Sequence, residues 1–103
     1  MTVDTPIGEK IIECVDTALE RALGGSAKYV IYFYLEKDFG LKKNEIHEKP
    51  ETFCRGVSSI FGEEGAKIIE ECIIQKMKQS FKLKQRHKST FVEVILTIKG
   101  RQK

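Results

Sequence analysis

The chain has 103 residues, of which 41% are apolar and 32% charged, a composition too hydrophobic for a disordered chain and too charged for a membrane protein. This length predicts a single globular domain over residues 1–103. The charges divide along the chain: residues 1–75 hold 14 Asp/Glu and 9 Lys/Arg, net −5, and residues 76–103 hold 9 Lys/Arg and one acid, net +8. The basic segment is therefore a candidate contact for a polyanion or an acidic partner.

The N-terminus and the cysteines further narrow the class of protein to which the chain can belong. Residues 1–6 lack a basic segment followed by an uncharged apolar run, so we expect no signal peptide and predict a cytoplasmic protein. Cys14, Cys54 and Cys72 lie far apart, without a Cys-x-x-Cys pair or a histidine at ligand spacing. We therefore expect no structural metal and no cofactor, and we interpret the three cysteines as core residues.

The first half of the chain predicts two helices. Apolar residues recur at three- and four-residue steps from Ile7 to Leu23, which indicates an amphipathic helix of about 17 residues. Gly24-Gly25 is expected to end it, and Ser26 to cap the next helix. That helix, near residues 27–38, contains the run from Tyr29 to Leu35, which is apolar on nearly every face. A strand also fits this run, but its polar flanks favour a central, largely buried helix over a strand or a ligand-stacking surface.

The middle of the chain predicts a polar connection and two more helices. Gly40 is expected to stop the second helix, and Leu41 and Ile46 to anchor the connection in the core. Pro50 suits the first turn of a third helix, and Gly62 separates it from a fourth. The expected apolar stripes of these two helices are Phe53, Val57, Ile60 and Phe61, then Ala66, Ile69, Ile73 and Met77, with Ile68 and Cys72 widening the second.

Residues 89–99 fit either a helix or a strand. Their apolar positions alternate from Val92 to Ile98, as in a strand, but those from Phe91 to Ile98 also recur at helical spacing. Thr90 and Glu93 form a possible capping box, which favours a helix, whereas a lone strand would have to pair across a dimer. The predicted fold class is therefore all-α: a single compact bundle of four to five helices, with a basic loop before a short C-terminal helix. The alternative is a C-terminal strand.

Four segments resemble a known family. They are Ala22-Leu23-Gly24-Gly25-Ser26, Tyr32-Phe33-Tyr34-Leu35-Glu36, Pro50-Glu51-Thr52-Phe53 and the stretch from Ile60 to Glu70. Together they resemble the Nitrosopumilus output domain, a small archaeal helical domain. The resemblance implies an all-helical fold and a role in signal output or protein interaction, without an established activity or assigned catalytic residues.

The basic segment supplies the candidate contact residues. Cations spaced in this way could follow a phosphate backbone and give weak, salt-dependent binding. They could also keep a solvated loop soluble, or bind the acidic part of a second copy or of another protein. The candidate contacts for a protein partner or a nucleic acid are Lys76, Lys78, Lys82, Lys84, Arg86, His87 and Lys88.

Catalysis is not expected from this sequence. The two histidines, His47 and His87, have no nucleophile or carboxylate at a spacing that defines a triad, although Glu48 adjoins His47. The sequence therefore predicts a non-enzymatic protein-interaction or signal-output module with a protein partner or self-association, no membrane contact and no small-molecule substrate. The alternative is weak, sequence-independent nucleic-acid binding through the basic C-terminal segment.

Overall fold

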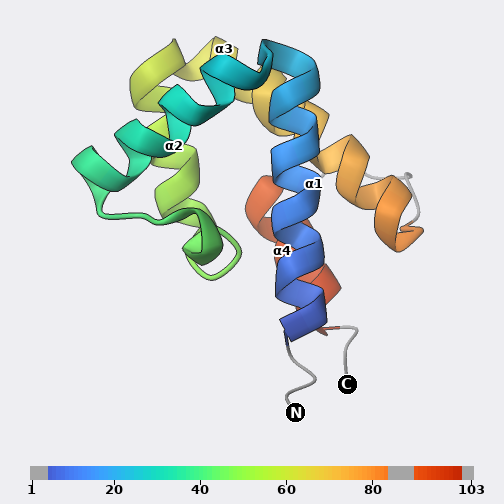
Figure 1. The fold of residues 1–103 in the computed structure, drawn as a ribbon. Coiled ribbons are helices and arrows are strands. Elements are labelled where there is room, and N and C mark those ends of the chain that lie inside the picture. The colour runs from blue at the N-terminus through green and yellow to red at the C-terminus, as the bar shows by residue number, and fades with distance from the viewer. Residues whose placement is uncertain (1–4, 84–89, 101–103) are drawn as a thin grey trace.

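The computed structural model describes residues 5–83 and 90–100. In these ranges the chain forms four α-helices and one 3-10 turn (Figure 1). The elements are α1 (Thr5–Leu23), α2 (Gly25–Phe39), η1 (Lys43–Glu45), α3 (Pro50–Phe81) and α4 (Phe91–Gly100). The radius of gyration is 13.0 Å, as expected for a compact chain of this length. The predicted all-α bundle is confirmed, and the alternative of a C-terminal strand is wrong because these residues form α4.

Helix α3 packs against each of the other three described helices. It contacts α1, α2 and α4, whereas η1 packs against α1. Near its middle Gly62 has φ 81° and ψ 169°, a conformation that residues with a Cβ atom rarely adopt. The expected break between two helices at Gly62 is thus a kink within one long element. The kink redirects the chain, so that α3 packs on α2 before it and on α1 after it (Figure 1).

A second glycine sets how closely α2 approaches α3. Gly56 is buried, and a Cβ atom at this position would overlap Cδ2 of Leu35. The missing side chain therefore makes room for Leu35, which is 1% exposed, between the two helices. Close packing of this kind leaves little space for a shifted α2.

The core is one continuous cluster to which every helix contributes. Leu41 and Ile46, from the connection after α2, are 1% and 0% exposed, so both predicted anchors are confirmed. The helical members are Ile11, Cys14, Val15, Ala18, Leu19, Ile31, Leu35, Phe53, Val57, Ala66, Ile69, Ile73, Ile74, Met77, Phe91, Val94, Ile95 and Ile98.

The N-terminus of α4 has the predicted capping box. The Thr90 backbone N–H donates to Glu93 Oε1, and the Glu93 backbone N–H donates to Thr90 Oγ1, each over 3.1 Å. These two bonds satisfy amides that a helix start otherwise leaves unpaired. The helix then places Phe91 against Phe53, with 5.0 Å between the ring centroids.

Three local predictions are wrong. Ile60 and Phe61, each 37% exposed, do not continue the buried stripe of Phe53 and Val57. Ser26 does not cap α2, because the helix already begins at Gly25, with Gly24 as its N-cap and no capping side chain. Ile68, 67% exposed, and Cys72, also exposed, do not widen the stripe of α3. Ile68 lies on the side of the helix opposite the buried Ala66. Cys72 lies on the flank between the buried and the solvent side, and it is exposed there.

Candidate functional site

Helix α2 presents an apolar face to solvent. Its sequence predicts a largely buried helix, and the structure corrects this: Ile31 and Leu35 are each 1% exposed, but four neighbouring large side chains are not buried. The exposed fractions are 64% for Tyr29, 51% for Val30, 60% for Phe33 and 41% for Tyr34. We call these four residues the α2 outer face.

The α2 outer face follows from helical geometry and from the positions of the other helices. Residues at i, i+1, i+4 and i+5 share one side of a helix, so the four side chains form one surface two turns long. Helices α1 and α3 both contact α2, and α4 contacts α3. The side of α2 that holds Ile31 and Leu35 is therefore covered, and the opposite side is left to solvent.

The rings of this region are held by contacts with one another and with lysines. Phe33 and Tyr34 meet edge to face, with 5.7 Å between centroids. The ammonium group of Lys37 lies 5.9 Å from the Phe33 centroid, and that of Lys28 lies 4.9 Å from the Tyr29 centroid. Such edge-to-face and cation–π contacts favour particular ring orientations.

A charged network fixes α2 on α1. The Lys28 side chain, 6% exposed, reaches across to α1, where Nζ lies 2.9 Å from Asp16 Oδ2 and 3.0 Å from Glu20 Oε1. The Tyr32 hydroxyl donates to Asp16 Oδ1 over 2.9 Å, and Lys43 Nζ lies 3.1 Å from the same oxygen. Asp16 therefore joins α1, α2 and η1, which sets the side that α2 turns to solvent.

The pKa values of the network agree with this geometry. Burial alone would raise the pKa of Asp16, but hydrogen bonds from Lys28, Lys43 and Tyr32 hold it below its usual value of 3.8. Hydrogen bonds to Asp16 and Glu20 raise the pKa of Lys28. Burial, followed by the bond to Asp16, raises the pKa of Tyr32. The carboxylate and the ammonium group therefore stay charged at neutral pH, and the phenol stays neutral.

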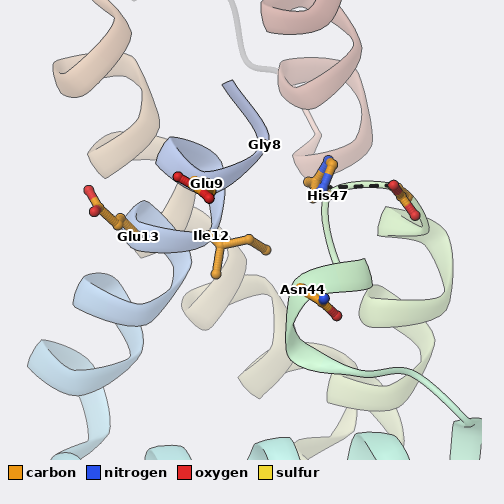
Figure 2. Close-up of a pocket in the computed structure, with 7 residues that line it drawn as sticks. Gly8, Glu9, Ile12, Glu13, Asn44 and His47 are labelled. Carbon is orange, nitrogen blue, oxygen red and sulfur yellow. Dashed lines mark ion pairs between the residues drawn. The ribbon is translucent and has the colours of Figure 1, made fainter. Parts of the chain in front are cut away.

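A pocket lies on another part of the molecule, between the first turns of α1 and the connection around η1 (Figure 2). Its volume is about 560 Å³. His47 closes one side, packed so tightly on Gly8 that a Cβ there would come within 2.7 Å of the imidazole ring. The residues that line it are Gly8, Glu9, Ile12, Glu13, Asn44, His47 and Glu48.

The chemistry of this pocket centres on His47. Burial and the positive charge of Lys99 lower its pKa below 6.5, while Glu48 acts in the opposite direction. Nε2 lies 4.0 Å from Glu48 Oε2, and Nδ1 is buried without a hydrogen-bond partner among the described residues. Among the described residues that line it, the pocket offers an imidazole and carboxylates, and none of these residues is a Ser, Thr or Cys.

The predicted basic contact residues fall into three groups. Lys82 is exposed, in the left-handed conformation (φ 57°) that ends α3. Lys76 is half-buried, and Lys78, at 7% exposed, lies within the fold, so Lys78 is a poor candidate for the predicted surface contact. The remaining four, Lys84, Arg86, His87 and Lys88, lie outside the described residues, and a role for the basic segment stays a prediction.

The cysteines differ more than their predicted shared role suggests. Cys14 is buried, Cys54 half-buried and Cys72 exposed, so the core interpretation is wrong for Cys72. Burial, with the negative charge and hydrogen bond of Glu70, raises the pKa of Cys54 to about 12. That thiol is therefore protonated at neutral pH.

In the part of the chain that the structure describes, no group of three or more His, Cys, Asp or Glu side chains could hold a metal ion.

The fold and surface together define a small helical bundle that carries an exposed aromatic helix face. The chain belongs to the Nitrosopumilus output domain 5 family, whose model matches residues 8–99. This confirms the resemblance seen in the sequence. Neither a curated protein nor a solved structure matches the chain. Across residues 5–83 and 90–100, none of the helices has the length and apolarity needed to span a bilayer.

The sequence contains a signal for the α2 outer face. The run from Tyr29 to Leu35 is uncharged around the helix, which requires cover on every side if the whole helix is buried. Helices α1 and α3 contact α2 and also each other, and α4 packs on α3, so part of α2 is left without cover. Two tyrosines in the exposed set are consistent with a surface that meets both water and apolar groups.

Proposed function

We propose that this chain is a non-enzymatic protein-interaction or signal-output module that binds its partner through the α2 outer face. The observation that carries the proposal is the exposure of Tyr29, Val30, Phe33 and Tyr34 on one side of one helix. From the area of large side chains, this face offers roughly 400 Å² of mostly apolar surface. Patches of that size on a folded chain are commonly functional.

The anchoring of α2 supports a binding role. Lys28 and Tyr32 tie α2 to Asp16 of α1, and Leu35 packs against Gly56 of α3. A face held in this way loses little conformational freedom when it binds, which favours affinity. Aromatic residues at the centre of a contact also tend to contribute most of its binding energy.

The family and the pocket fit the same proposal. The family is described as an output domain, a description that suggests contact with another macromolecule. The described residues that line the pocket beside His47 supply no hydroxyl or thiol nucleophile, and among them Glu48 lies within ion-pair distance of the imidazole. We therefore place the proposed activity on α2 and assign no reaction to the pocket.

This proposal is tested by immobilising the chain and measuring which proteins it retains from an extract of the source cells. The variants are Phe33→Glu, on the α2 outer face, and Leu96→Glu as a matched control on α4. Their exposed fractions are 60% and 61%. We expect at least one protein to be retained by the wild type and the control but reduced about tenfold or more by Phe33→Glu. Equal retention by all three chains would contradict a role for α2.

The charge distribution supports a second candidate function, weak nucleic-acid binding. Residues 76–103 hold 9 Lys/Arg against one acid, and neutralising phosphates releases counterions. The test is a gel shift with Lys82, Lys84, Arg86 and Lys88 replaced by glutamine. We expect retardation of the wild type in about 50 mM salt and a loss of it in the variant. The absence of a shift in the wild type would exclude this candidate.

A further inference from the structure

If the α2 outer face is the binding surface of the proposed function, the chemistry of α2 identifies its partner. We propose that the α2 outer face binds the same face of a second copy of this chain, with the two α2 helices antiparallel about a two-fold axis. The axis passes between Val30 and Phe33, so that each of these residues faces the other in the partner copy. Tyr29 and Tyr34 pair in the same way on either side of the centre.

The centre of the face carries no charge that would repel its own copy. The run from Tyr29 to Leu35 contains no Asp, Glu, Lys, Arg or His. The nearest cation, Lys28, is 4% exposed and ion-paired with Asp16 and Glu20 of its own chain. A two-fold contact places like residues near one another at its axis, so an uncharged centre is a requirement that this helix meets.

The N-terminal end of α2 in one copy complements the C-terminal end of α2 in the other copy in size and charge. The N-terminal end consists of Gly25, Ser26 and Ala27, and the C-terminal end of Glu36, Lys37 and Asp38. In the antiparallel register the long charged side chains face the small residues of the other copy. The two carboxylates then lie near the positive end of the partner's helix dipole.

A parallel register would be unfavourable. It would place Lys37 beside Lys37 and the carboxylates of Glu36 and Asp38 beside their own copies. Like charges held close together destabilise a contact, and the small N-terminal residues would face each other across a gap. The distribution of charge and size along α2 therefore selects the antiparallel arrangement.

The area of the face predicts a weak dimer. Its four side chains supply roughly 400 Å² per copy, whereas a standard interface buries about 800 Å² on each partner. The flanking charged residues at both ends add to this area only at the rim. We therefore expect reversible association, with a dissociation constant on the order of micromolar or weaker.

Sedimentation over a range of protein concentrations tests self-association. We expect the wild type and Leu96→Glu to form dimers as the concentration rises, and Phe33→Glu to remain monomeric or to dimerise about tenfold more weakly. If Phe33→Glu fails to fold, as judged by circular dichroism, Phe33→Ser replaces it. A wild type that stays monomeric throughout would overturn the proposed dimer.

Disulfide trapping tests the antiparallel register. In a Cys72→Ser background, which removes the exposed native thiol, Val30→Cys and Phe33→Cys are oxidised separately and as a mixture. The proposed register brings position 30 close to position 33 of the other copy, so in an equimolar mixture the mixed disulfide should exceed each like-with-like product by clearly more than the twofold ratio that random pairing gives. Preferential linkage of position 30 to position 30 would overturn the antiparallel arrangement.

The two proposals fail in different ways. A monomeric wild type, together with a protein from the cell extract whose binding still requires Phe33, overturns the dimer and leaves the interaction module in place. A dimer that Phe33→Glu does not weaken overturns the proposed site of self-association. If in addition Phe33→Glu leaves binding in the extract unchanged, the proposed function fails as well.

Discussion

Helices α1 and α2 are neighbours that differ on their outer sides. The exposed residues of α1 are chiefly charged or small, such as Glu9, Lys10, Glu13 and Arg21. The exposed side of α2 instead carries Tyr29, Val30, Phe33 and Tyr34. Both helices bury aliphatic side chains in the same core, so the difference concerns only what each presents to solvent.

The outer side of α1 shows what folding requires of a surface helix, and the outer side of α2 carries apolar residues beyond that requirement. An amphipathic pattern such as that of α1 is sufficient to pack a helix on a core and keep its outer side solvated. No residue of the α2 outer face belongs to the core cluster or to the half-buried residues packed against it, so burial in the fold of a single chain does not account for its apolar character. A binding role accounts for it, and the following substitutions test how well the two sides of α2 separate.

The largest effect is expected on the buried side of α2. Leu35→Ala removes a side chain that is 1% exposed and leaves a cavity against Gly56, so we expect a loss of about 2–5 kcal/mol in the free energy of unfolding. Urea denaturation at low protein concentration measures it. A loss no larger than that of Phe33→Ala would contradict the division of α2 into two unlike sides.

A substitution at Gly62, the kink that lets α3 contact both α1 and α2, should destabilise the fold nearly as much as Leu35→Ala. Gly62→Ala places a Cβ atom on a residue with φ 81° and ψ 169°, and we expect a loss of about 1–3 kcal/mol in the free energy of unfolding. A Cβ there has no neighbouring atom within 4 Å, so the loss would come from the backbone alone. Gly100→Ala, near the end of α4, is the control and should change stability little.

The network between α1 and α2 should make stability depend on pH. Because the pKa of Asp16 is lowered on folding, its contribution is present above about pH 4 and is lost as the pH falls through the folded-state pKa. Asp16→Asn should cost on the order of 1–2 kcal/mol near neutral pH. The cost should shrink in acid, as urea denaturation at about pH 6 and about pH 2 would reveal. A cost that stayed constant would mean that the charge of Asp16 contributes nothing.

The smallest effect is expected on the α2 outer face. Phe33→Ser removes a ring that is 60% exposed, and we expect the free energy of unfolding of the monomer to change by no more than about 0.5 kcal/mol. Thermal unfolding of Phe33→Ser and Leu35→Ala at low protein concentration compares the two losses of stability. A large loss would show that Phe33 serves the fold, and the binding role of the face would then lose its main support.

The agreement between sequence and structure is best where local chemistry decides. Pro50 at the first turn of α3, the kink at Gly62 and the capping box of Thr90 and Glu93 all follow from the conformational and hydrogen-bonding properties of single residues. Ser26 is the local exception, since the positive φ of Gly24 starts α2 two residues earlier than a serine cap at position 26 requires.

The candidate site could not be predicted in the same way. Periodicity identifies a buried side only where one side is more apolar than the other, and α2 is apolar all round. The pocket beside His47 likewise brings Gly8 and Glu9 of α1 next to the connection after α2, residues that are almost 40 positions apart in the chain.

The sequence by itself determined that residues 7–38 and 50–81 are helical, that the helical path is interrupted at Gly40 and Gly62, and to which family the chain belongs, whereas it left a C-terminal strand open as the alternative to a helix. These are properties of local conformation and of residue order. The tertiary structure alone decided that Ile31 and Leu35 are buried and that Tyr29 and Phe33 face solvent. The reason is that the positions of α1 and α3, fixed by the Asp16 network and by Gly56, determine which side of a uniformly apolar helix is covered.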